Sequence, residues 1–182
     1  VEVGNKIFFF FFMLVLRVIK KNEESIDTKV LFGGKLTTHK GINVPGIKIR
    51  RDFLSEADKS DLLFAIKNDA DYIAASFVSN KEDLFEMKEF LNQNGAKDIK
   101  IIAKIENGEG VKKIDEIIAN SDGIMVARGD LGVEIPLEKI PHIQKKIIKS
   151  CISEGKISIV ATEMLESMTN SLRPTRAEVS DV

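Results

Sequence analysis

Three charged residues stand near the ends of apolar segments and could act together in chemistry. Lys104 and Glu106 are two positions apart in the segment IKIIAKIE, so both side chains would project to the same side of a strand. Asp130 follows the next apolar segment and offers a second carboxylate. Two carboxylates with open coordination positions suit Mg²⁺, which prefers oxygen ligands. A structural Lys–Glu ion pair is the alternative, but burying two acids beside one lysine would be costly, so we favour the metal interpretation.

The turn that contains Asp130 has glycines where a backbone must come close to a ligand. It reads Arg128-Gly129-Asp130-Leu131-Gly132. If a short helix starts there, its free N–H groups would form a site for a carboxylate or phosphate. An ordinary turn between a strand and a helix is equally compatible with these glycines.

Two hydroxyl side chains also stand at predicted strand ends. Thr162 follows the segment ISIVA, and its hydroxyl could bind an anion or relay a proton. Ser76 follows YIAA and is a weaker candidate, because it could simply pack or cap a helix.

The residues just described are spaced by a repeating alternation of strands and helices. Four continuously apolar segments read as buried strands, at 71–78, 99–106, 123–127 and 157–161. Capping residues and apolar periodicity predict helices at 55–68, 81–94, 109–120 and 138–153. The first of these begins with a capping-box pattern at Ser55 and Asp58, and Gly95 and Gly155 end the second and the fourth.

Apolar strands separated by helices predict an α/β fold with a parallel sheet covered on its faces. The polar strand ends recur at intervals of about one βα unit, roughly 30 residues, which favours a (β/α)₈ barrel whose active site lies at the carboxyl ends of its strands. A doubly wound open sheet would also bind ligands at strand ends, but the sequence has no GxGxxG fingerprint.

Composition narrows the classes of function. The 182 residues carry 27 Lys plus Arg and 28 Asp plus Glu, so the surplus of basic residues that nucleic-acid binding needs is absent. Cys151 is the only cysteine, which excludes an intrachain disulfide, fits a cytoplasmic location and predicts a buried thiol on an apolar helix face. Neither His39 nor His142 has a second ligand at zinc spacing. Val1 in place of Met suggests that the sequence starts inside a longer chain.

The apolar run IFFFFFMLVL occupies residues 7–16. A helix needs about 20 residues to span a bilayer, so the run is too short for that role, and no signal-peptide cleavage pattern follows it. Phenylalanine, valine and isoleucine favour sheets, so we expect a buried strand or strand pair rather than a membrane segment.

Several of these segments together resemble the pyruvate kinase family. The run IKIIAKIENGEGV at 99–111 is similar to that family's active-site signature, and SDGIMVARGDLGVEIP at 121–136 is similar to its next strand and turn. Further landmarks follow the family's order: KGINVPG at 40–46, ASFV at 75–78, ATEMLESM at 161–168 and RPTRAEVSDV at 173–182. The resemblance covers the chain from about residue 30 onward.

The resemblance implies transfer of the phosphoryl group of phosphoenolpyruvate to ADP, giving pyruvate and ATP. It makes Lys104 and Thr162 catalytic and assigns Glu106 and Asp130 to Mg²⁺ (or Mn²⁺). Gly129, Asp130 and Thr162 would bind the substrate carboxylate, with Ser76 and Arg128 as neighbours. The family also uses K⁺, and most of its members are cytoplasmic homotetramers.

The resemblance also implies a division of the chain and some departures from the pattern. Residues 1–38 match the end of a β-rich lid domain and 39–182 the central part of the barrel, about four βα units. Phe9 to Phe12 replace an expected Asp-Asp-Gly turn, and Glu163 stands where the family usually has glutamine. Because the remaining strands and most K⁺ ligands fall outside these residues, we expect the isolated 182-residue chain to be inactive. The alternatives are a decayed, non-catalytic relative and, less favoured, a metal-dependent pyruvate aldolase or lyase.

Overall fold

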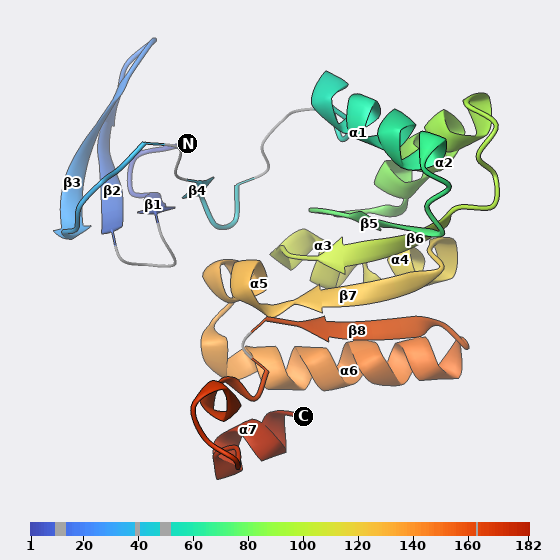
Figure 1. Cartoon of the computed structure of the whole chain (residues 1–182). Coiled ribbons are helices and arrows are strands. Elements are labelled where there is room, and N and C mark those ends of the chain that lie inside the picture. The colour runs from blue at the N-terminus through green and yellow to red at the C-terminus, as the bar shows by residue number, and fades with distance from the viewer. Residues whose placement is uncertain (10–13, 39–40, 48–51, 163) are drawn as a thin grey trace.

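A computed structural model describes residues 1–9, 14–38, 41–47, 52–162 and 164–182 and contains two four-stranded sheets. One sheet is parallel, in the order β5-β6-β7-β8, and the other is antiparallel, in the order β3-β2-β1-β4. The strands of the parallel sheet point toward the antiparallel sheet (Figure 1). The expected α/β fold with a parallel sheet is therefore confirmed. The described strands form an open sheet, with β5 and β8 at its edges, rather than a closed barrel.

The parallel sheet consists of β5 (Tyr72–Ala75), β6 (Lys100–Ile105), β7 (Gly123–Ala127) and β8 (Ile157–Ala161). The bounds predicted for the last two strands are confirmed. The first prediction, 71–78, runs too far, because the backbone turns after Ala75 and Phe77 adopts a left-handed φ of 57°. In parallel pairing the carboxyl ends of neighbouring strands lie at one edge of the sheet, so the polar residues after β5, β6, β7 and β8 gather there.

Two long helices begin where their capping residues predict. In α1 (Glu56–Lys67) the Ser55 side chain accepts a hydrogen bond from the Asp58 N–H, and the Asp58 carboxylate accepts from the Ser55 N–H in return. The same reciprocal bonds join Asn80 and Asp83 at the start of α2 (Lys81–Gln93). These bonds satisfy backbone donors that a helix start leaves without intrahelical partners.

The predicted helix 109–120 is wrong as a single helix. It is divided into α3 (Gly108–Lys112) and α4 (Ile114–Asn120) at Lys113, whose φ of −103° and ψ of 20° depart from helical values. Gly108 and Gly110 give α3 a weak intrinsic preference for helix, so its conformation depends on packing against the rest of the fold. The predicted helix 138–153 begins slightly later, as α6 (Ile140–Ser153), after the 3₁₀ turn η1 (Leu137–Lys139).

The main core lies between the parallel sheet and its helices. Its fully buried members include Ile105 and Ile124 from the strands and Leu84, Ile117 and Ile147 from the helices. The Cys151 thiol is buried in the same core on α6, as predicted, and burial raises its pKa. In the described part of the chain no helix is both long and apolar enough to cross a membrane.

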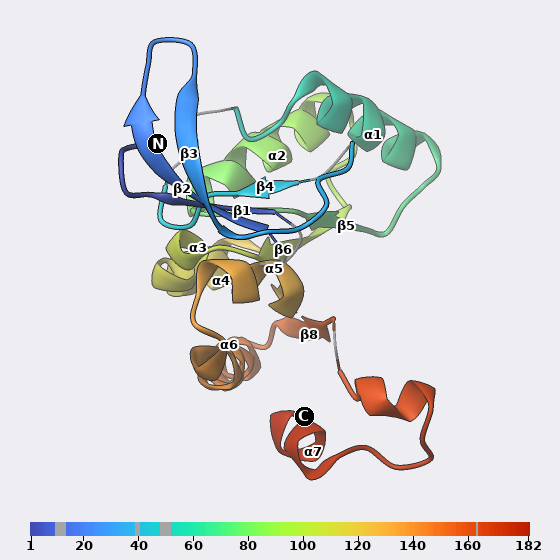
Figure 2. The same ribbon diagram turned by 90° about the vertical axis from the view of Figure 1, so that its left-hand side faces the viewer.

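The antiparallel sheet contains β1 (Lys6–Phe9), β2 (Leu14–Lys21), β3 (Ile26–Phe32) and β4 (Ile42–Asn43). β1 and β2 pair antiparallel, which confirms the expected strand pair for the described ends of the apolar run; Phe10, Phe11 and Phe12 lie outside the described residues. Figure 2 views this sheet from its own side of the molecule. The short β4 pairs with β1. The domain division at residue 38 stays a prediction.

Two short helices complete the elements around the strand ends. The helix α5 (Arg128–Glu134) follows β7 directly, so a short helix does start at the glycine-containing turn. After β8 come the 3₁₀ turn η2 (Glu166–Thr169) and the helix α7 (Arg176–Asp181), which begins with a capping box between Thr175 and Glu178.

Candidate active site

The Lys104 and Glu106 side chains do project to the same side of β6, and they form an ion pair. Lys104 Nζ lies 2.8 Å from Glu106 Oε1. The Glu106 side chain is 1% exposed and the Lys104 side chain 24% exposed, so the pair is largely shielded from water. A carboxylate this deeply buried requires hydrogen-bond partners within the protein.

The end of β5 supplies the remaining partners of this ion pair. The Phe77 N–H donates to Glu106 Oε2 at 2.6 Å, and Lys104 Nζ donates to the Ser76 hydroxyl at 2.9 Å. The left-handed φ of Phe77 belongs to the turn that presents its N–H to the carboxylate. Ser76, the weakest candidate on sequence grounds, therefore contacts Lys104 directly.

Asp130 comes from the neighbouring strand connection. It is the third residue of α5, which follows β7, and its side chain is half-buried. Among the described residues none donates a hydrogen bond or forms an ion pair with its carboxylate. Within the same residues there is also no group of three or more His, Cys, Asp or Glu side chains that could hold a metal ion.

Glu106 and Asp130 nevertheless fit a magnesium ion. Mg²⁺ keeps several waters and is commonly held by one or two carboxylates together with substrate oxygens, so a cluster of three acids is not required. Glu106 is fixed by Lys104 and Phe77, while Asp130 has no competing partner in the described part of the chain.

Thr162 lies at the end of β8 and contacts the start of α5. Its hydroxyl accepts a hydrogen bond from the Gly129 N–H at 2.8 Å and donates to the Ala161 carbonyl at 2.6 Å. The backbone of Thr162 is left-handed, with a φ of 70°, and its side chain is exposed. The Gly129 N–H, predicted to be free for an anion, is thus occupied by Thr162. Glu163 lies outside the described residues.

Arg128 directs its guanidinium toward α6, Met164 and α7. Its Nη2 lies 2.6 Å from Asp181 Oδ2, and its Nη1 donates to Gln144 Oε1 at 3.3 Å and contacts Met164 Sδ at 2.6 Å. The expectation that Arg128 neighbours a substrate stays a prediction, since the contacts in the structure are internal.

Gln144 is a residue that the sequence reasoning missed. Its side chain is fully buried, and its Nε2 donates to the Asp181 backbone carbonyl at 2.7 Å. A signal was present in the sequence, because position 144 falls on the same face of α6 as Ile140, Ile147 and Cys151. A polar residue in that series predicts a buried hydrogen bond.

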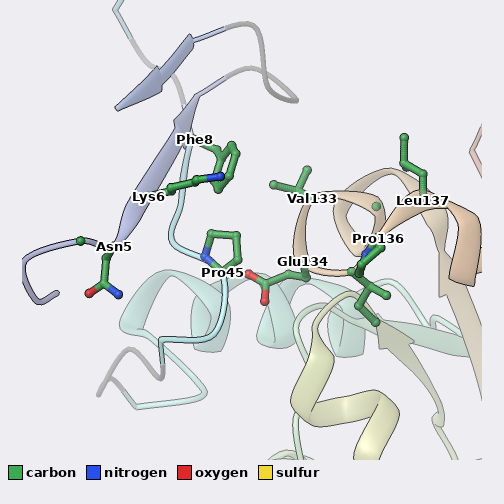
Figure 3. Close-up of a pocket in the computed structure, with 11 residues that line it drawn as sticks. Asn5, Lys6, Phe8, Pro45, Val133, Glu134, Pro136 and Leu137 are labelled. Atoms are coloured by element: carbon green, nitrogen blue, oxygen red, sulfur yellow. The ribbon is translucent and has the colours of Figure 1, made fainter. Parts of the chain in front are cut away.

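A hollow of about 630 Å³ lies between the antiparallel sheet and the segment from α5 to η1. Figure 3 shows Lys6 and Phe8 from β1 on one side of it and Val133, Glu134 and Leu137 on the other. Burial raises the pKa of Glu134, an effect that a hydrogen bond from the Gly46 backbone opposes. Among the described residues, those that line the hollow include Gly132 to Leu137 but not Asp130 or the Lys104–Glu106 pair.

Comparison with known proteins gives a consistent result along the whole chain. A family model described as "Pyruvate kinase, barrel domain" matches residues 1–182. The chain is 49% identical over 182 residues to a pyruvate kinase of Clostridium perfringens and 52% identical over 184 residues to one of Geobacillus stearothermophilus. All of this chain is aligned in both cases, but only 38% and 31% of the relatives. The chain thus spans about a third of the length of these relatives.

Proposed function

Because this chain belongs to the pyruvate kinase family, we propose that it carries the central part of an active site that transfers the phosphoryl group of phosphoenolpyruvate to ADP, giving pyruvate and ATP. The observation that supports this proposal most directly is the buried Lys104–Glu106 pair at the carboxyl edge of the parallel sheet, with Asp130 in the helix α5 that follows the next strand. Carboxylates and a cation at that edge are typical of barrel active sites.

Glu106 and Asp130 are the residues that would hold Mg²⁺ (or Mn²⁺). When bound, the ion would neutralise negative charge on the phosphoryl and enolate oxygens. The role of the protein is to keep Glu106 in one orientation through its bonds to Lys104 and the Phe77 N–H. A dependence on K⁺ is part of the same proposal and would be measured by adding KCl to a K⁺-free assay.

Lys104 is proposed to stabilise negative charge that develops during the transfer. Its ammonium is held between the Glu106 carboxylate and the Ser76 hydroxyl, and it retains partial access to solvent. A preoriented cation in a poorly hydrated site stabilises charge without a reorganisation cost at the moment of reaction. Such catalysis relies on positioning and electrostatics and needs no covalent intermediate with the protein.

Thr162 and the α5 start are proposed to bind the substrate carboxylate. The Gly129 N–H, which now donates to Thr162 Oγ1, would donate to a carboxylate oxygen instead. This exchange releases the Thr162 hydroxyl, which would then lie beside the carbon that is protonated to give pyruvate. A hydroxyl both donates and accepts, so it can serve the carboxylate and a proton relay.

The proposal is tested with the full-length gene product, by measuring pyruvate formation from phosphoenolpyruvate and ADP with and without Mg²⁺. Asp130→Asn keeps the size of the side chain and removes its charge, and we expect the rate to fall about 100-fold to 1,000-fold. Asp115→Asn, on the exposed face of α4, is the matched control and should leave the rate unchanged.

An unchanged rate in Asp130→Asn would refute the assigned role of that carboxylate. Failure of the wild-type protein to form pyruvate in a Mg²⁺-dependent manner would refute the proposed function as a whole. The family further supports a cytoplasmic homotetramer, and light scattering on the full-length product would measure that oligomeric state.

A further inference from the structure

Arg128 links the two segments that carry Gly129 and Thr162. It precedes Gly129 in α5, and its Nη1 contacts Met164 Sδ, two residues after Thr162. Together with the hydrogen bond from the Gly129 N–H to Thr162 Oγ1, these contacts close a small ring between the α5 start and the segment after β8. The geometry of that ring depends on where the Arg128 guanidinium is held.

Asp181 and Gln144 hold the guanidinium. The Asp181 carboxylate forms a 2.6 Å ion pair with Nη2, in which the side chains of Arg128 and Asp181 are 15% and 21% exposed. Gln144 accepts from Nη1 and donates to the Asp181 backbone carbonyl, so it fixes both partners from α6. An arginine has a rigid, planar set of donors, and anchoring one end of it orients the other.

The helix α7, which carries Asp181, is itself fastened in two places. The Lys145 ammonium on α6 donates to the Ser180 carbonyl at 2.8 Å. Glu178, in the first turn of the helix, accepts from the Ser167 N–H of η2 at 2.8 Å. α7 is therefore a fixed support against which the Arg128 side chain is placed.

We propose that Asp181 is a positioning residue for the substrate carboxylate site: through Arg128 it fixes the start of α5, so that the Gly129 N–H stays directed at the place where a substrate carboxylate would replace the Thr162 hydroxyl. This inference rests on the proposed function, and it deepens that proposal by assigning a role to a side chain that contacts neither the ion pair at Lys104 nor Asp130. Asp181 touches no reacting atom and acts through Arg128 alone.

The test compares steady-state kinetics of full-length variants. In Asp181→Asn the guanidinium loses its charged partner while the side-chain volume is kept. We expect the KM for phosphoenolpyruvate to rise about fivefold to tenfold, which corresponds to about 1–1.4 kcal/mol and lies within the range of one ordinary hydrogen bond. The KM for ADP should stay within about twofold, since Arg128 supports only the carboxylate site.

Three controls separate positioning from general loosening of the fold. Asp181→Glu retains the charge and should recover most of the wild-type KM for phosphoenolpyruvate. Lys145→Met loosens α7 without removing the partner of Arg128 and should leave both KM values near those of the wild type. A double-mutant cycle between Arg128→Lys and Asp181→Asn, measured by thermal unfolding, should show a coupling free energy between the two side chains even where activity is low.

The outcomes distinguish the two proposals. A wild-type protein that forms no pyruvate refutes the proposed function and this inference with it. An active wild type whose Asp181→Asn variant keeps its KM for phosphoenolpyruvate refutes the positioning role alone. In Asp181→Asn, equal increases in the KM for phosphoenolpyruvate and the KM for ADP would show that Asp181 acts through the stability of α7. A selective rise in the KM for phosphoenolpyruvate in Lys145→Met would show the same. Either result also overturns the inference.

Discussion

Gly110 in α3 provides a sharp test of how the strand-end turn is held in place. A Cβ atom at this position would lie 2.7 Å from the Val78 carbonyl oxygen, a backbone atom that cannot rotate away. Val78 directly follows Phe77, whose N–H binds Glu106. Gly110→Ala should therefore push α3 and the turn after β5 apart and weaken the support of the buried carboxylate.

The size of the effect follows from two opposing contributions. Alanine in place of glycine in a helix stabilises it by about 0.5–1 kcal/mol. Overpacking a buried site costs about 1–3 kcal/mol, and the upper part of that range applies here because the clash is with backbone. We expect Gly110→Ala to destabilise the fold by about 1–2 kcal/mol net and to slow phosphoryl transfer.

Gly108 is the matched control, since it lies in the same short helix and a Cβ there meets nothing within 4 Å. Gly108→Ala should be neutral or stabilising by up to about 1 kcal/mol. Both variants are made in the full-length product and compared by denaturant unfolding and by the rate of pyruvate formation. If Gly110→Ala were as stable and as active as Gly108→Ala, the close approach of α3 to Val78 would not support the site as reasoned.

Two further predictions concern titratable groups outside the ion pair. Hydrogen bonds from the Ser167 hydroxyl and N–H, and then from the Thr175 N–H, lower the pKa of Glu178 to about 2. A carboxyl group whose pKa is lowered in the folded state stabilises the fold at pH values above its pKa in the unfolded chain. The stability difference between wild type and Glu178→Gln should therefore be constant above about pH 4.5 and shrink as the pH falls toward 2. Thermal unfolding at a series of pH values would measure this difference. Cys151 is fully buried and the pKa of its thiol is raised, so iodoacetamide should not label it in the native protein. Peptide mapping should find Cys151 labelled only after unfolding in urea. Fast labelling of the native protein would contradict its place in the core.

Features governed by neighbouring residues could be predicted from the sequence. The predicted capping box at Ser55 and Asp58 involves side chains three residues apart, so its pattern is visible in a short window, and the box that the structure adds at Asn80 and Asp83 has the same spacing. The bounds of β7 and β8 were equally accessible, because each is a continuous apolar run. The same-side placement of Lys104 and Glu106 follows from strand periodicity alone.

Features that depend on distant contacts could not be predicted. The break at Lys113 separates α3 from α4, and nothing in the local sequence pattern marks it. The bond from the Gly129 N–H to Thr162 joins residues 33 positions apart, and it removes a donor that the glycine pattern suggested would be free. Arg128 looked like a residue for a ligand, yet its partners on α6 and α7 become apparent only in three dimensions.

The order of strands in the parallel sheet also bears on how the chain reaches its fold. Each strand pairs with the one that precedes it in sequence, as Tyr72 with Lys100, Ile102 with Gly123 and Gly123 with Ile157. Each pairing therefore closes a loop of roughly 20–35 residues, the usual length of one βα unit. The entropy cost of closing a loop grows with its length, so no pairing in this sheet has to close a very long loop. A nascent chain can add one βα unit at a time to an edge that already exists, so the sheet can grow during synthesis in the order in which its strands leave the ribosome.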